Sequence, residues 1–181
     1  PLYSSAASDV YKRQLMGKAL KDGYRDKAFL MTKHHGRDKK TAMQHLEDSL
    51  RRLDTDVIDL WQFHEVVYDD DPKMIFAPEG GIEAADLAKK QGKVRFIGFT
   101  GHRDPMLHLQ MLAYGYPWDA VQMPLNVLDP HYKSFQKHVL PVLTRRDIGV
   151  IAMKTMGSGH VLRADVTTVK ESLDYVWSQS V

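Results

Sequence analysis

Residues 56–66 read DVIDLWQFHEV, a mainly apolar run that stops at His64 and Glu65. Val, Ile, Leu, Trp and Phe within so few positions are typical of a strand buried on both faces, as in a parallel sheet. Burying a polar ring costs free energy unless the ring finds a hydrogen-bond partner. A histidine at the end of such a strand therefore requires an explanation.

Four further runs rich in apolar and β-branched residues alternate with longer segments whose apolar residues fall at helical spacing. These runs are KAFLMTK at 27–33, KVRFIGFTGH at 93–102, AVQMPLN at 120–126 and GVIAMKTMGSG at 149–159. Such alternation is typical of a parallel sheet with helical crossovers. The sequence therefore predicts an α/β fold with five strands and at least five helices.

Boundary signals place the helices between these strands. Asp38 is the expected N-cap of a helix with one apolar stripe, and Gly92 is expected just after a helix over 82–90. Asp104 and a proline at the first helical position begin the next helix. Residues 135–146 predict a helix kinked by a proline, and 167–179 predict a last helix. The expected core residues of the first and third helices are Ala42, Met43, Leu46, Leu50, Leu53, Met106, Leu109 and Leu112.

The composition limits the possible partners. A chain of 181 residues, 43% of them hydrophobic, suits one domain with a sizeable core. Its 25 Lys and Arg are interspersed with 23 Asp and Glu, so the net charge of +2 supplies no strong field for nucleic acid or membranes. No apolar run approaches the ~20 residues that span a bilayer. The absence of cysteine excludes thiolate metal sites and fits a cytoplasmic protein.

The polar residues at the strand ends favour a closed barrel over an open doubly wound sheet. An open sheet usually has a glycine-rich turn after its first strand, and GxGxxG does not occur here. In a barrel, every strand delivers its carboxyl end to the same mouth. The expected deliveries are Lys33, His64, Thr100, Gly101, His102, Gln122 to Asn126, and Lys154.

Each of these residues also has a structural interpretation. Lys33 could open a surface loop, and His64 could simply donate to a backbone carbonyl. Gln122 lies within an apolar strand, where a buried amide needs a partner, and a neighbouring backbone could serve. The histidine pair at 34–35 precedes a basic segment, so we expect a solvated loop rather than a metal site. The methionines Met43, Met106, Met111 and Met123 are expected to fill the core.

The five motifs, in this order and at these intervals, resemble consecutive barrel strands of the aldo-keto reductase family, from about Leu15 onward. The resemblance implies a partial TIM barrel of about strands 3 to 7 with their helices. It also implies a nicotinamide cofactor, usually NADPH with NAD as the alternative, and hydride transfer between that cofactor and a small aldehyde, ketone or alcohol. The oligomeric state is left open.

The resemblance also implies roles for individual residues. His64 is similar to the histidine that orients and polarises the carbonyl, and Lys33 to the lysine that favours ionisation of a tyrosine acid. Gln122 resembles the glutamine that holds the nicotinamide carboxamide, and Thr100 replaces a serine with the same task. An asparagine is common where Gly101 stands here.

The segment after the last predicted strand resembles the part of the family that holds the rest of the cofactor. Met153 stands where many members stack an aromatic ring on the nicotinamide, and a thioether can also pack on a ring face. The turn from Lys154 through Met156 to Gly157 resembles the segment whose backbone contacts the pyrophosphate. With Thr100 and Gln122, these complete the expected cofactor-binding set.

The resemblance leaves three family strands unaccounted for. Two would precede Leu15 and supply the catalytic Asp and Tyr, and one would follow residue 181. We do not assign Tyr11 as the tyrosine, because its surroundings depart from the family pattern. Residues 1–14 are interpreted as a non-native leader and 15–181 as the partial barrel domain. We expect the 181-residue chain alone to be inactive.

Two other functions are compatible with the residues. A metal-dependent hydrolase could use His64, His102 and Lys33, but no carboxylate or His-x-His pair accompanies them at a strand end, so we expect no metal site. A non-catalytic regulatory barrel that retains nucleotide binding is the closer alternative.

Overall fold

The computed structural model describes residues 5–179, with side chains from residue 12 onward. Its residues fall into two compact units. The N-terminal unit comprises the chain up to Phe63 together with Lys73–Ile97, and the C-terminal unit comprises His64–Pro72 together with the chain from Gly98 onward. The short helix α3 (Asp71–Ile75) lies where the chain passes from one unit to the other.

The strands are parallel wherever their register is defined, as the sequence predicts. In the N-terminal unit, β1 (Met31–His34) pairs in parallel with β2 (Ile58–Phe63), and the first residues of β3 (Val94–Thr100) follow in the strand order. In the C-terminal unit, the end of β3 pairs with β4 (Ala120–Pro124), which pairs with β5 (Gly149–Met153). The predicted α/β fold with five strands is confirmed within the described residues.

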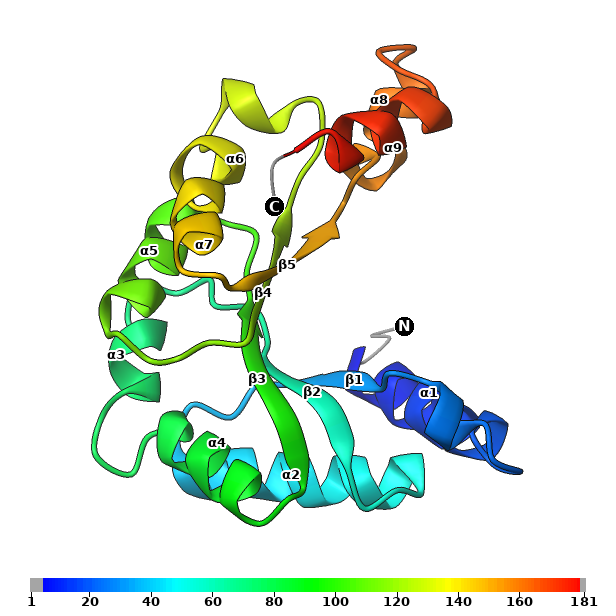
Figure 1. Ribbon diagram of the computed structural model, residues 1–181, viewed down its shortest axis with the longest axis vertical. Coiled ribbons are helices and arrows are strands. Elements are labelled where there is room, and N and C mark those ends of the chain that lie inside the picture. The colour runs from blue at the N-terminus through cyan, green and yellow to red at the C-terminus, as the bar shows by residue number, and fades with distance from the viewer. Residues whose placement is uncertain (1–4, 180–181) are drawn as a thin grey trace. The chain divides into compact units, whose positions relative to one another are not determined.

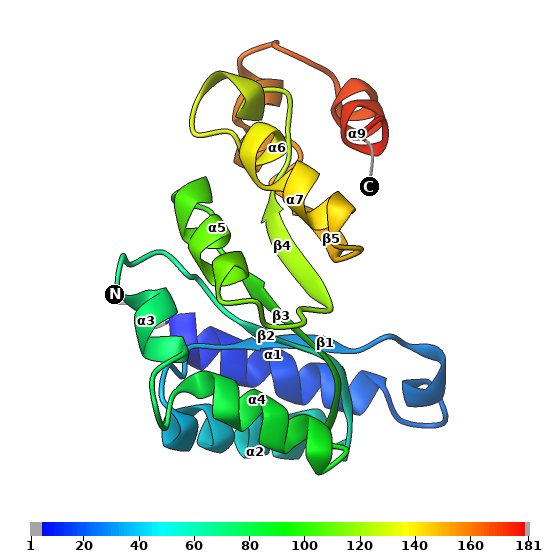
Figure 2. The same cartoon turned by 60° about the vertical axis from the view of Figure 1, so that its left-hand side comes forward.

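The N-terminal unit packs its helices against one another as well as on the strands. Figures 1 and 2 show α4 (Gly81–Lys90) lying beside α2 (Lys39–Leu53), and α1 (Ser5–Ala19) also contacts α2. The short helix η1 (Arg25–Lys27) precedes β1. Every residue of β2 is buried, which agrees with the uninterrupted apolar run in the sequence.

The C-terminal unit has more and shorter helices. Neighbouring contacts link α5 (Pro105–Ala113) to α6 (Phe135–His138), α6 to α7 (Leu140–Arg145), and α7 to β5 (Figure 1). The remaining elements are η2 (Asp129–His131), η3 (Gly157–Gly159), α8 (His160–Arg163) and α9 (Val169–Trp177). No described helix is both long and apolar enough to cross a membrane.

The helix boundaries agree closely with the sequence signals. The Asp38 carboxylate accepts the Thr41 N–H at 2.8 Å, and the Asp104 carboxylate accepts the Met106 N–H at 2.9 Å. Both are N-caps of the predicted type. Thr168 and Glu171 form a capping box at the start of α9.

Two expectations about helices were wrong. Residues 135–146 form two helices that break at Val139, because Pro141 occupies the first turn of α7 rather than kinking one continuous helix. Met106 is 55% exposed, since α5 buries the stripe of Leu107, His108, Met111 and Leu112 instead. α1 lies in a segment for which no secondary structure was predicted, and it includes residues interpreted as a leader.

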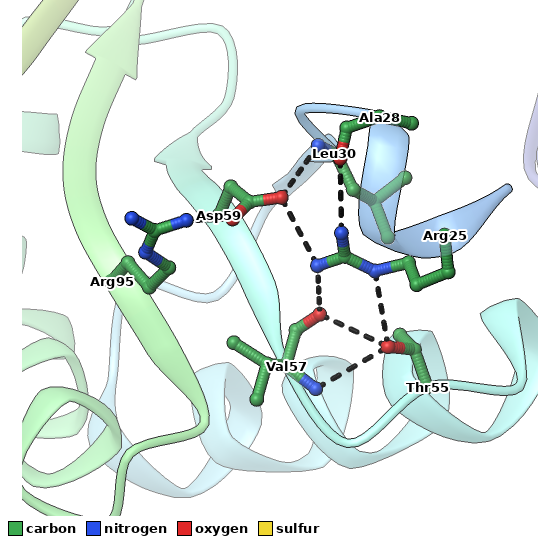
Figure 3. Close-up of polar contacts among 7 residues, drawn as sticks. All are labelled: Arg25, Ala28, Leu30, Thr55, Val57, Asp59 and Arg95. Carbon is green, nitrogen blue, oxygen red and sulfur yellow. Dashed lines mark hydrogen bonds and ion pairs between the residues drawn. The ribbon is translucent and has the colours of Figure 1, made fainter. Parts of the chain in front are cut away.

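A buried carboxylate forms hydrogen bonds and ion pairs near the amino-terminal ends of the strands in the N-terminal unit. Asp59 is 2% exposed and accepts the Leu30 N–H at 2.7 Å, an Arg25 guanidinium nitrogen at 3.0 Å and an Arg95 guanidinium nitrogen at 2.8 Å (Figure 3). Arg25 also donates to the carbonyls of Ala28 and Val57. Burial raises the pKa of Asp59, but the hydrogen bond from Leu30 and the two guanidinium groups outweigh it and hold the pKa below 3.8.

An aromatic cluster fills the core of the C-terminal unit around a buried histidine. The His108 ring is fully buried, with ring centroids 5.0 Å from Phe99 and 4.9 Å from Phe135. Neither ring nitrogen has a hydrogen-bond partner within residues 5–179. Burial lowers the pKa of His108 to about 3, against an opposing effect of the Gln122 backbone, which does not reach hydrogen-bond geometry with the ring.

Candidate functional site

The strand register brings predicted site residues to one edge of the sheet in the C-terminal unit. Thr100 is the register partner of Gln122, and Pro124 is the register partner of Met153. These residues lie at or near the carboxyl ends of β3, β4 and β5. Because neighbouring parallel strands present their carboxyl ends at the same edge, Thr100, Gln122 and Met153 belong to one region of this unit.

His64 meets Thr100 directly after β2 ends. The His64 Nδ1 atom lies 3.1 Å from the Thr100 hydroxyl oxygen, and the Glu65 N–H donates to the same oxygen at 3.2 Å. Glu65 has a φ of 52°, so the chain turns sharply after the histidine. The histidine is half-buried while Thr100 is only 1% exposed, so a buried hydroxyl anchors the ring that the sequence analysis singled out.

The turn after His64 also explains the glycine next to Thr100. The Val66 N–H donates to the Thr100 carbonyl at 2.8 Å, which brings this turn close to the end of β3. A Cβ atom at Gly101 would lie 2.5 Å from the Val66 carbonyl oxygen and 2.6 Å from a ring carbon of His108. No larger residue fits there without movement of backbone and buried ring, so a side-chain contact from this position is excluded sterically.

Gln122 presents an unsatisfied oxygen. The residue is half-buried, yet its side-chain oxygen is buried and accepts no hydrogen bond from any residue in the described part of the chain. A buried acceptor without a donor costs about 1–3 kcal/mol. A carboxamide N–H2 group, such as that of nicotinamide, has the donor that this oxygen lacks, so the residue fits the expected cofactor.

The segment after β5 forms a chain of tight turns. Lys154 has a φ of 55°, Gly157 of 54° and Ser158 of 57°, and the Gly157 N–H donates to the Lys154 carbonyl at 2.8 Å within the turn. The Asn126 side chain donates to the Lys154 carbonyl at 3.3 Å and so links the end of β4 to this turn. Met153 and Met156 are half-buried and Lys154 is exposed.

Lys33 belongs to the N-terminal unit, and its position is described by its pairing with β2. It is half-buried, lies one residue before the end of β1, and is the register partner of Gln62. Its carbonyl accepts an Arg13 guanidinium N–H at 3.0 Å. Lys33 and Gln62 therefore share one face of the β1–β2 pair, because register partners in a parallel ladder project to the same side.

Gln62 is a residue that the sequence analysis missed. It is fully buried, and neither its amide nitrogen nor its oxygen has a hydrogen-bond partner among residues 5–179. Like Gln122, Gln62 lies inside an apolar run, two residues before His64, where a buried amide needs a partner. Period-two alternation places its side chain on the opposite face of β2 from Trp61 and Phe63.

The expectation of a solvated loop at the two adjacent histidines was wrong for the first of them. His34 is 2% exposed and stacks on Trp61, with ring centroids 3.9 Å apart and planes 17° from parallel. His35 is exposed, as expected. His102 lies in the C-terminal unit, where its ring nitrogen is 3.8 Å from a Glu65 carboxylate oxygen and both side chains are partly exposed.

Sequence comparison finds a family match and relatives that are named as reductases. Residues 3–172 match the model of the Aldo/keto reductase family. An aldo-keto reductase of Alternaria alternata is 27% identical over 72% of this chain and 34% of its own length. A methylglyoxal reductase of Yersinia pestis is 37% identical over 57% of this chain and 36% of its own length. The chain thus spans about a third of the curated relatives it matches.

Structural comparison gives the same answer. An aldo-keto reductase of Bacillus halodurans in its holo form is 26% identical, with a TM-score of 0.67 over 84% of this chain and 51% of that one. A glycerol dehydrogenase of Gluconobacter oxydans is 23% identical, with a TM-score of 0.65 over 83% of this chain and 47% of that one, and shares the fold. The α/β fold described above thus corresponds to part of the barrel of these enzymes. The chain belongs to the aldo/keto reductase family.

Proposed function

We propose that this chain is part of a longer NAD(P)H-dependent oxidoreductase that transfers hydride between a nicotinamide and a small carbonyl compound or alcohol. The family membership supports the reaction class. The observation that carries the assignment to particular residues is the buried Gln122 oxygen, which has no donor among the described residues and lies beside the His64–Thr100 pair at the strand ends.

His64 acts on the substrate oxygen in this proposal. Hydride addition to a carbonyl places negative charge on its oxygen, so a site for this reaction needs donors directed at that oxygen. An imidazole held by a buried hydroxyl on one ring nitrogen can direct its other nitrogen at a carbonyl. His64 would orient and polarise the carbonyl, and its removal would mainly lower turnover.

Lys33 has a supporting role. A phenol with an unperturbed pKa near ~10 needs a nearby cation to act as an acid close to neutrality. Lys33 would supply that cation to a tyrosine contributed by another part of the longer protein. Its register partner Gln62 lies on the same face, and the Gln62 amide has no hydrogen-bond partner in the part of the chain that the structure describes, which is consistent with a polar cluster at this position.

The cofactor would be held by Thr100, Gln122 and the residues that follow β5. Gln122 would accept from the carboxamide, Met153 would pack on the ring face, and Lys154, Met156 and Gly157 would contact the pyrophosphate through the turn described above. When bound, the cofactor supplies or accepts the hydride. We propose NADPH as the cofactor, with NAD as the alternative.

The substrate would be a small carbonyl compound or the corresponding alcohol. Relatives named as a methylglyoxal reductase and a glycerol dehydrogenase motivate short, polar test compounds. We propose a cytoplasmic location and neither nucleic acid nor a membrane as a partner, since the net charge of +2 gives no strong field.

The test is NADPH oxidation by the longer protein with methylglyoxal and glyceraldehyde. We expect turnover that falls on the order of 100-fold or more in His64→Ala, as for loss of a positioned polar catalyst. His138→Ala, which removes an exposed histidine of α6, is the matched control and should leave turnover unchanged. Turnover that requires a metal and no nicotinamide would contradict the proposal, whereas cofactor binding without turnover would favour a regulatory barrel.

A further inference from the structure

The hydrogen bonds of the Thr100 hydroxyl determine which of its groups donates and which accepts. A threonine hydroxyl has one hydrogen to donate and two lone pairs that accept. The Glu65 N–H can only donate, so at 3.2 Å it occupies a lone pair of the Thr100 oxygen. The hydroxyl hydrogen is therefore left for another acceptor.

His64 Nδ1, 3.1 Å away, is the acceptor that the structure places beside that hydrogen within residues 5–179. Thr100 is 1% exposed, so solvent offers little alternative. If Nδ1 instead carried the ring hydrogen, the Thr100 oxygen would accept twice and its own hydrogen would be buried without an acceptor. A buried donor left in that state is unfavourable, because it has lost its hydrogen bonds to water and gained none.

We propose that Thr100 is a positioning residue that sets the tautomer of His64. The hydroxyl donates to Nδ1, so the neutral ring keeps its hydrogen on Nε2. The inference rests on the proposed function in one respect, since Nε2–H is then the group that donates to a substrate carbonyl. His64 acts as a hydrogen-bond donor of fixed direction, and the proton that completes the alcohol comes from a different group.

This arrangement gives Thr100 a second task beside the cofactor contact implied by the family resemblance, and it limits the form of that contact. A hydroxyl whose hydrogen goes to His64 has no hydrogen left for a cofactor oxygen and can offer only its remaining lone pair. The turn after His64 involves the same Thr100 oxygen, because this oxygen accepts the N–H of Glu65, the residue whose φ is 52°. Thr100 thus fixes both the direction of the ring and the identity of its protonated nitrogen.

The test is the ring nitrogen-15 NMR spectrum of the longer protein with labelled histidine, at about pH 8, where an ordinary histidine is neutral. His64→Gln identifies the His64 signals by their loss. We expect an unprotonated Nδ1 and a protonated Nε2 in the unsubstituted protein and in Thr100→Ser, which keeps a hydroxyl. In Thr100→Val, which keeps the shape, the preference for Nε2–H should fall at least about fivefold, the equivalent of one hydrogen bond of ~1 kcal/mol.

The result separates this inference from the proposed function. A protonated Nδ1 in the unsubstituted protein, or the same tautomer ratio in Thr100→Val, would overturn the inference even if NADPH is oxidised. The expected spectra without NADPH oxidation would support the tautomer assignment and contradict the proposed reductase. If Thr100→Val weakens cofactor binding but leaves the His64 tautomer ratio unchanged, Thr100 serves the cofactor and not the histidine, and the inference is wrong.

Discussion

Replacing Asp59 by asparagine should destabilise the fold of the N-terminal unit. The carboxylate is 2% exposed and receives three polar contacts, from Leu30 N–H, Arg25 and Arg95. Asparagine keeps one accepting oxygen but turns its N–H2 group toward at least one of these donors. The Arg95 side chain is 59% exposed, so its pairing is discounted for solvent screening.

The magnitude follows from the contacts that remain buried. Hydrogen bonds to a charged group contribute about 1.5–3 kcal/mol each, and removing one partner of a buried pair typically costs about 3–5 kcal/mol. With the Arg95 contact discounted and one oxygen retained, we expect a loss of about 2–3 kcal/mol in the free energy of unfolding for Asp59→Asn. The matched control Arg95→Gln removes the exposed partner and should cost no more than about 1 kcal/mol.

The assay is urea unfolding of the longer protein, followed by tryptophan fluorescence, with the stability difference taken from the shift in midpoint. The folded-state pKa of Asp59 is lowered, so its contribution is complete above the ordinary value of 3.8 and is lost as the pH falls through the folded-state value. The difference in stability between the unsubstituted protein and the Asp59→Asn variant should therefore narrow only in acid. A cost within about 0.5 kcal/mol of zero at neutral pH, or an equal cost for Arg95→Gln, would refute the reasoning.

Three further outcomes are expected. Gln122→Ala should weaken NADPH binding about fivefold or more, the equivalent of ~1 kcal/mol. Gln110→Ala, which changes an exposed glutamine of α5, should leave the affinity unchanged, and equal affinities of the two variants by titration would count against the assignment. The pKa of His108 is lowered from 6.5 to about 3, so below pH 6.5 the unfolded chain takes up a proton that the folded chain does not. The free energy of unfolding should therefore fall by about 2 kcal/mol between neutral pH and pH ~5, and His108→Leu should abolish this decrease in urea titrations. The 181-residue chain expressed alone should show no NADPH-dependent turnover and should be poorly soluble, because β1 and β5 are the edge strands of its sheet and edge strands expose unpaired backbone groups. An active monomer that unfolds cooperatively would contradict this prediction.

The strands and most helices could be predicted because their signals are local. Each strand is a short apolar run between turn residues, and the N-caps Asp38 and Asp104 precede their helices as expected. The stripe of α5 was misjudged because the segment PMLHLQMLA is apolar at nearly every position, so spacing alone does not say which side is buried. The buried face of α5 is the one that carries His108, and the burial of His108 depends on residues distant in sequence.

The candidate site was predictable only as far as strand ends identify it. His64, Thr100 and Gln122 were singled out by their positions, but the contact between His64 and Thr100 spans 36 residues and has no sequence signature. The burial of His34 against Trp61 depends in the same way on the register of β1 and β2. Asp59 was overlooked because a single acidic residue in an apolar run does not show which cations will meet it.

The most direct test of the central claim is the fate of the hydride. The longer protein would be given methylglyoxal and NADPH with deuterium at the transferable position of the nicotinamide, and the product would be analysed by mass spectrometry. The proposed chemistry predicts one deuterium on the former carbonyl carbon, formed at a rate that drops in His64→Ala and stays unchanged in His138→Ala. A reduced product without deuterium, or product formation that persists without nicotinamide, would contradict the assignment of this chain to carbonyl reduction.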